Sequence, residues 1–374
     1  MHGTLTFTTP ADVVPDEERP GLRRAQPNWE DGAEGDEHVC ELNDLTDPET
    51  TEPGLEAAGF ETVDLSDNAA LQQVLAVVRD EDQISEASAA ALRDSLTGVE
   101  FGLANGKTLR IDVVVDDGLF HRRSGPNWLD VNPGGITGTN GHSGAQHVHG
   151  DQDVFGTPLR QLLGGAAPDM FRHATPDGRN DHADTFLLNI WIPLHAPVQP
   201  LALMDRRSLD VERHQLRYGL VVDGFLERDE DATVNDIWSF LHDEGQQWYI
   251  RTDMGPDQAY VFDTLGTPHG AAVLPGENAV EALYLALGRA CDAMENGDAD
   301  ALRAVVAQTP APPVDASASV RRSGERMADL LAEATIMLTE SSDSAATWAA
   351  KARDAMDDVI RRSVEMRLVA TLVD

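Results

Sequence analysis

Short apolar runs with a period of two recur through the middle of the chain and predict β-strands. The strongest is residues 186–194 (FLLNIWIPL), in which Asn189 and Trp191 fall on one face. Gly and Pro residues separate the runs, as expected of turns between strands. Such a series is typical of a β-sandwich or jelly roll. Further strands are predicted at residues 60–65, 108–116, 200–205, 247–251 and 259–263.

Helical periodicity predicts helices towards both ends of the chain. Residues 85–97 form one of them, with Ser85 and Glu86 placed as an N-terminal cap. The apolar, β-branched end of residues 361–373 predicts a last strand that returns to the jelly roll. The other predicted helices are residues 69–78, a short one at 157–163, and three Ala-rich runs at 277–307, 319–339 and 345–360.

These elements predict a mainly β protein with added α: a double-stranded β-helix (jelly roll, cupin-like) core with a C-terminal helical insertion before the last strand. Residues 1–60 are rich in Pro, Gly and acid, which predicts a loop-rich arm laid over the core. We expect four parts: an N-terminal arm with helices (1–98), a catalytic jelly roll (99–276), a helical insertion (277–356) and a final core segment (357–374).

Charge and cysteine content narrow the classes of function. The 374 residues carry a formal net charge of −37, which repels nucleic acid and anionic membranes. No apolar run is long enough to span a membrane and the N-terminus lacks signal-peptide features, so we expect a cytoplasmic protein. Cys40 and Cys291 are the only cysteines, so a bound metal must use His, Asp or Glu.

A metal site is indicated by His149 and Asp151, which are separated by one residue. On a strand, residues i and i+2 point to the same face, so the imidazole and the carboxylate converge. Together with one more distant His they match the 2-His-1-carboxylate triad of non-haem Fe(II) oxygenases. His269, in a turn after a predicted strand, is a candidate. Isolated triplets of this kind are often ordinary surface residues, and such a His is often bonded only to backbone.

A basic segment, residues 121–124 (HRRS), stands out in an acidic chain. Arg122 there could dock an anionic substrate or co-substrate, although a salt bridge to a neighbouring carboxylate is the simpler and favoured explanation. The Gly-rich residues 132–144 lack the ending of a phosphate loop and predict a flap before the His149 strand.

Taken together, the motifs resemble a family of non-haem Fe(II)/2-oxoglutarate oxygenases. It is the group that contains the cephamycin 7-alpha-hydroxylase component, the fungal gibberellin desaturase and the aspergillic-acid-type hydroxylases. The segments that carry the resemblance follow one another in family order: residues 148–152 (VHGDQ), 189–193 (NIWIP), 200–205 (PLALMD), 248–249 (WY), 262–263 (FD), 268–269 (PH) and 361–367 (RRSVEMR).

The resemblance implies that His149, Asp151 and His269 ligate Fe(II). It also implies that Arg361 and Ser363 hold the distal carboxylate of 2-oxoglutarate, with Asn189 nearby. Arg367 is the second candidate for binding this carboxylate, and residues 321–323 (RRS) are a third, less favoured candidate. We expect no catalytic residues beyond the metal ligands. The residues expected to contact the substrate are Arg122, Trp191, Asp205 and Trp248.

The predicted function is therefore hydroxylation or desaturation of a small natural-product or amino-acid-derived molecule with dioxygen, giving succinate and CO2. For the helical segment 277–356 two roles stay open: it mediates formation of a homodimer, or it covers the pocket as a lid. Two departures from the family are visible: Arg361 lies 92 residues after His269 (361 minus 269), and Ile192 replaces a basic residue. The alternatives are an iron oxygenase that does not use 2-oxoglutarate and a non-catalytic cupin-like protein that binds a metal or a small molecule.

Overall fold

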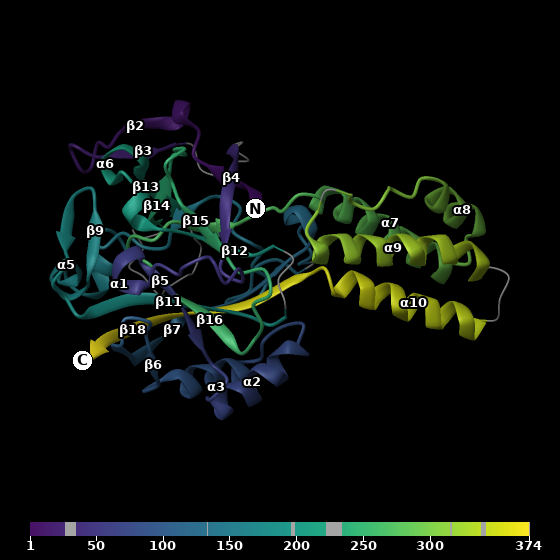
Figure 1. Ribbon diagram of the computed structural model, residues 1–374, viewed down its shortest axis with the longest axis horizontal. Helices are drawn as coiled ribbons and strands as arrows, with labels where there is room; N and C mark the ends of the chain where they lie inside the picture. Colours follow the sequence, from purple (N-terminus) through teal and green to yellow (C-terminus); the bar gives the residue numbers. More distant parts are fainter. Residues whose placement is uncertain are drawn as a thin grey trace.

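The computed structural model describes residues 1–26, 35–132, 134–195, 199–221, 234–314, 316–337 and 342–373. Within these ranges two curled sheets form a jelly roll, and a bundle of long helices extends from one end of it (Figure 1). The predicted fold class is therefore confirmed. In the larger sheet the described strands are, in spatial order, β1 (His2–Phe7), β4 (Asp36–Asp44), β15 (Trp248–Ile250), β12 (Leu201–Met204), β17 (His269–Ala271), β8 (His149–Gly150), β14 (Val234–Phe240), β13 (Gln215–Val221), β3 (Arg23–Ala25) and β2 (Val13–Pro15).

The smaller sheet faces this one across a shared interior. Trp191 and Phe262 from the smaller sheet and Leu203 from the larger one belong to one buried cluster, which identifies the inner faces. The described strands of the smaller sheet are β5 (Phe60–Asp64), β16 (Gln258–Asp263), β11 (Thr185–Pro193), β18 (Arg361–Val373), β7 (Thr108–Ser124) and β6 (Glu100–Gly102); a separate hairpin comprises β9 (His173–Thr175) and β10 (Gly178–Asn180).

Strand β11 shows how the sequence sets the two faces of the smaller sheet. Its even-numbered residues Phe186, Leu188 and Ile190 are fully buried against helices α2 (Ala69–Arg79) and α3 (Glu86–Leu96). Because strand side chains alternate, Asn189 and Trp191 then point into the jelly roll. The two helices cover this sheet from below in Figure 1. Ser85 accepts a hydrogen bond from the Ser88 amide at 3.2 Å, so the predicted cap of α3 is confirmed.

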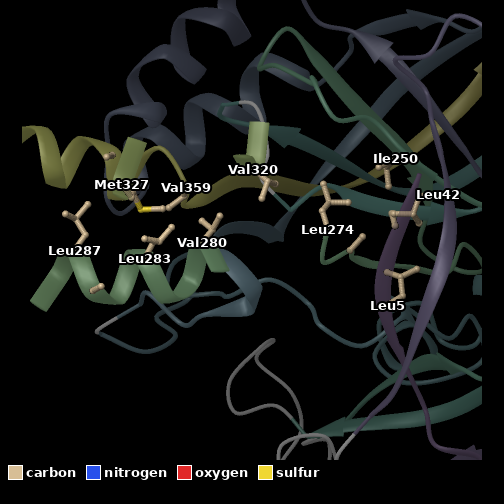
Figure 2. Close-up of a cluster of buried hydrophobic side chains, with 14 of the residues drawn as sticks. Leu5, Leu42, Ile250, Leu274, Val280, Leu283, Leu287, Val320, Met327 and Val359 are labelled. Atoms are coloured by element: carbon tan, nitrogen blue, oxygen red, sulfur yellow. The ribbon is translucent and has the colours of Figure 1, made fainter. Parts of the chain in front are cut away.

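The C-terminal helices are joined to the jelly roll by one continuous apolar cluster. Figure 2 shows Leu5, Leu42 and Ile250 of the larger sheet in line with Leu283 and Met327 of the bundle. The bundle consists of α7 (Glu277–Glu295), α8 (Ala299–Ala307), α9 (Ala318–Met337) and α10 (Ser342–Asp357). The remaining short helices are α1 (Leu55–Ala58), α4 (Leu159–Leu162), α5 (Ala167–Met170), α6 (Val211–His214), and the 3-10 turns η1 (Pro10–Asp12), η3 (Pro126–Trp128) and η4 (Arg206–Ser208).

Two sequence-based expectations about these elements were wrong. Residues 1–60 are not simply a loop-rich arm, because β1 and β4 pair with each other and extend the larger sheet. The predicted helix 277–307 is two helices, since Gly297 has a φ of 64° and the Asp298 side chain caps α8. The first difference arises from strand pairing and the second from a glycine turn and a helix cap, and the apolar pattern reports neither of them.

Candidate metal centre

The three predicted ligands meet in the interior of the jelly roll. His149 on β8 lies directly opposite His269 on β17 in antiparallel register, which brings the two rings to a centroid separation of 4.3 Å. Asp151 follows β8 and points to the same side as His149. One ligand atom from each residue lies within 4.8 Å of the other two, and within the described part of the chain this is the only such group of His, Cys, Asp or Glu.

Backbone carbonyls fix which nitrogen of each imidazole faces the centre. The Nδ1 atom of His149 lies 2.9 Å from the His147 carbonyl, and that of His269 lies 3.0 Å from the Thr267 carbonyl. A carbonyl only accepts hydrogen bonds, so each Nδ1 carries the proton. Each Nε2 therefore presents a lone pair to the interior, which is the form in which a neutral imidazole binds a metal.

The charge balance of this group fits a cation. The two Nε2 atoms lie 3.5 and 3.7 Å from Asp151 Oδ1, so three electron-pair donors face one another. Burial, followed by the neighbouring His269, lowers the pKa of His149 and favours its neutral form. Burial opposes ionisation of Asp151, but His269, His149 and Arg367 outweigh it and hold that pKa well below its usual range. Two imidazole nitrogens and an ionised carboxylate form a suitable ligand set for a divalent metal.

A buried guanidinium lies on the facing sheet, and no ion pair of this group is found within the described residues. Arg361 is 3% exposed, and its Nε and Nη1 atoms have no hydrogen-bond partner in the described chain. Its guanidinium carbon lies 5.4 Å from the centre of the Trp191 ring. Burial, followed by the nearby Arg122, lowers the pKa of Arg361 to about 10, although Glu365 and Glu277 act in the opposite direction, so the side chain is charged at neutral pH. The buried Ser363 hydroxyl, two residues along the same face of β18, is also without a partner.

The helical insertion does not displace Arg361 from the jelly roll. Strand β18 pairs with β11 from Ser363, opposite Pro193, to Thr371, and Arg361 itself lies opposite Ser124 on β7. The chain leaves the core at the start of α7 and returns to it after α10 at the same end of the molecule (Figure 1). The 92-residue separation from His269 is thus absorbed by the bundle, which is consistent with the small entropic cost of lengthening a connection.

A polar chain joins the predicted Asn189 to the metal ligands. Its Nδ2 atom donates to Asp151 Oδ2 at 3.3 Å and lies 3.5 Å from Glu365 Oε2. Glu365 in turn accepts a hydrogen bond from Arg122, which also donates to the Ser143 carbonyl at 3.0 Å. The simpler explanation of Arg122, an ion pair with a neighbouring carboxylate, therefore describes it in this structure. Glu365 was not predicted as a site residue; its even spacing between Ser363 and Arg367 is the signal that places it on the inner face.

The structure separates Arg361 from its two sequence-based competitors. Arg367 lies on the same inner face but approaches Asp151, with Nη2 3.8 Å from Oδ2. Arg321 and Arg322 are exposed on α9 in the helical bundle, so they do not line the interior.

Two of the predicted substrate contacts have structural roles. Trp248 pairs with Met204 and packs in the cluster on the opposite face of the larger sheet from His269, so it is a core residue. Asp205 is bound by Arg207, at 2.6 Å between Oδ2 and Nη2, and caps the η4 turn. Its carboxylate is thus satisfied locally. Trp191 remains on the inner face, as predicted.

The fold and the site define a jelly-roll protein with an interior His-Asp-His group on one sheet and a buried arginine on the facing sheet. A family model described as "Oxidoreductase/YMDC permease-like domain" matches residues 5–281, and the chain belongs to this family. Among proteins of curated function, none matches the sequence. Across the described residues, every helix is too short or too polar to cross a membrane.

Two solved structures of the iron and alpha-ketoglutarate-dependent endoperoxidase NvfI are similar in fold. The first is 14% identical in sequence with a TM-score of 0.45, covering 99% of this chain and 97% of that one. The second, in a different conformation, is also 14% identical and has a TM-score of 0.47, with the same coverage.

Proposed function

We propose that this protein is an Fe(II)/2-oxoglutarate-dependent oxygenase acting on a small molecule. The observation that carries the proposal is the convergence of His149, Asp151 and His269, with both Nδ1 atoms tied to carbonyls and both Nε2 atoms directed inward. When bound, iron and 2-oxoglutarate would supply the oxidation of an unreactive C–H bond by dioxygen, with succinate and CO2 as co-products.

The chain's own residues supply binding and orientation. His149 and His269 would donate nitrogen lone pairs and Asp151 a negative charge, while three protein ligands leave the other metal positions to co-substrate and dioxygen. The Asn189 amide holds Asp151 Oδ2 at 3.3 Å and so fixes which carboxylate oxygen faces the histidines.

The buried Arg361, whose Nε and Nη1 atoms have no hydrogen-bond partner in the described chain, favours this proposal over an iron oxygenase that does not use 2-oxoglutarate. Burying a charge that has no ion-pair partner costs the folded protein on the order of several kcal/mol. A guanidinium matches a carboxylate in two parallel hydrogen bonds, and the free Ser363 hydroxyl offers a further donor. An anionic co-substrate with a terminal carboxylate would remove the cost.

The test is anaerobic addition of Fe(II) and 2-oxoglutarate, followed by the visible charge-transfer band of the chelate. We expect the band in the wild type and its loss in His149→Ala and His269→Ala. Arg361→Leu should keep the iron site but weaken 2-oxoglutarate binding by about 10- to 100-fold, the loss expected for hydrogen bonds to a charged group.

Arg321→Leu is the matched control, because it removes an exposed arginine from α9 without touching the interior. It should bind 2-oxoglutarate like the wild type. Persistence of the band in His269→Ala would remove that residue from the ligand set. Absence of succinate from the iron-loaded wild type, with 2-oxoglutarate and dioxygen present, would refute the proposal.

The finer expectations rest on the sequence alone, through its resemblance to the family or through its composition and patterning. They are a natural-product or amino-acid-derived substrate, hydroxylation or desaturation as the outcome, membership of the cephamycin-hydroxylase-like group, a cytoplasmic location and the possibility of a homodimer. The four-part division at residues 98, 276 and 356 likewise remains a proposal.

A further inference from the structure

An apolar pocket of about 180 Å³ lies between helix α4 and the inner face of the smaller sheet. Leu159 and Leu163 of the α4 region form one wall, together with Phe171. Leu187 of β11 and Val369 of β18 form the opposite wall. Leu162, which is 61% exposed, lies where the pocket meets solvent, so a ligand has a route in.

The pocket adjoins the candidate metal centre. Its wall includes Arg367, whose Nη2 atom is 3.8 Å from Asp151 Oδ2, and Gln152, the residue after Asp151. Leu187 and Val369 stand two residues from Asn189 and Arg367 on the same strand faces. A molecule in the pocket would therefore extend towards the open side of the metal ligands.

The chemistry of the walls defines what fits. Arg367 supplies a cation at the inner end, and its Nε atom is buried without a hydrogen-bond partner in the described chain. Asp117, an acid of the wall, is exposed at the rim. The rest of the wall is mainly aliphatic or aromatic, and such sites bind through apolar burial with a few polar groups that set orientation.

The volume limits the size of the apolar group. Ligand pockets usually measure about 300–1,000 Å³, whereas an apolar cavity of about 150 Å³ holds a molecule of the size of benzene. The 180 Å³ pocket therefore suits one ring or a branched chain of similar bulk, with the rest of a larger substrate outside it.

We propose that this is the substrate pocket, and that the substrate class is a molecule with a ring-sized apolar group and a carboxylate or other oxygen acceptor that binds Arg367. That the ligand is a substrate rests on the proposed function, but ligand binding in the pocket can be tested without turnover.

The probe is 4-fluorophenylacetate, followed by 19F NMR in the metal-free protein. It should bind the wild type, and Arg367→Leu should weaken binding at least about tenfold, since one charge-assisted pair is worth that much. Arg367→Leu should weaken binding of the neutral 4-fluorotoluene much less. Leu163→Trp should abolish binding of both probes by filling the pocket, whereas Leu285→Trp, at an exposed position of α7, should not.

Leu163→Ala gives a second reading if the larger side chain prevents folding. It should shift preference towards a bulkier probe, 4-fluoro-1-naphthylacetate, relative to the phenyl compound. Unchanged binding of both probes in Leu163→Trp and in Leu163→Ala would overturn the assignment of the pocket.

Mn(II) then reports where the probe lies. In the wild type it should enhance 19F relaxation of bound 4-fluorophenylacetate, and His149→Ala should remove the enhancement but retain binding. Probe binding without enhancement, in a protein that forms the iron and 2-oxoglutarate band, overturns the pocket as the substrate site. Intact probe binding without any such band instead overturns the proposed function, and with it the claim that the ligand is a substrate.

Discussion

At the scale of single residues, β18 concentrates polar side chains on one face. Arg361, Ser363, Glu365 and Arg367 alternate with Val364 and Met366, which are fully buried against the covering helices. A strand with period-two polarity is usually half exposed to water. Here both faces are covered, so the polar face must bind other protein groups or a ligand.

Gly118 is the residue that permits this strand to come close to β7. A Cβ atom there would lie 2.5 Å from the Arg367 Cβ and 3.2 Å from its backbone nitrogen. We expect Gly118→Ala to shift β18 and lower the free energy of unfolding by about 1–3 kcal/mol, as for other overpacked sites. Urea unfolding measures the change.

Gly102→Ala is the matched control for that substitution. Gly102 is a strand residue of the same sheet, but a Cβ atom added there would have no neighbouring atom within 4 Å. The stability of this variant should stay within about 0.5 kcal/mol of the wild type, the usual range for surface changes. An equal loss in both variants would mean that the close approach to Arg367 is not the cause.

At the scale of elements, the sequence predicts best where the signal is local. The alternation in residues 186–194 and the cap at Ser85 suffice to predict β11 and α3. Strand β4 (DEHVCELND) could not be predicted in this way, because it is acidic and only Cys40 and Leu42 are buried. It forms because β1 and β15 pair with it on either side, which no local pattern encodes.

The start of α7 contains a buried carboxyl group whose ionisation is coupled to stability. Glu277 is fully buried and accepts hydrogen bonds from the Leu274 and Asn127 amides at 2.9 and 3.1 Å. Burial raises its pKa to about 7. Because the folded-state pKa exceeds that of the unfolded chain, about 4.3, the native state binds the proton more tightly and loses stability as pH rises between these values.

Glu277→Gln should remove this pH dependence. Relative to the wild type, the variant should gain roughly 2–3 kcal/mol in free energy of unfolding between pH 4.5 and pH 8, at about 1.4 kcal/mol per pKa unit. Urea titrations at both pH values measure the difference. Glu281→Gln, one turn further along α7, should leave the pH dependence in place. A constant difference between Glu277→Gln and the wild type would contradict the assignment.

At the scale of the whole molecule, the candidate site combines local and distant information. His149 and Asp151 are two residues apart, so their convergence follows from strand geometry alone. The meeting of His149 with His269 depends on the register of β8 and β17. The position of Arg361 depends on a helical bundle that folds back to the core. The packed core sets both the register of β8 with β17 and the return of the chain from the bundle to β18, so local spacing could not predict them. The order of the family motifs along the chain is what indicated His269 and Arg361 as site residues.

The net charge of −37 should make the stability of the molecule depend on salt. Self-repulsion destabilises a compact state, and its range falls from about 30 Å at 0.01 M to about 3 Å at 1 M ionic strength. We therefore expect the thermal midpoint to rise by a few degrees between these limits in NaCl, with a similar rise in KCl. Sucrose of matched osmolality controls for exclusion effects. A midpoint that falls with salt would mean that the ion pairs outweigh the repulsion.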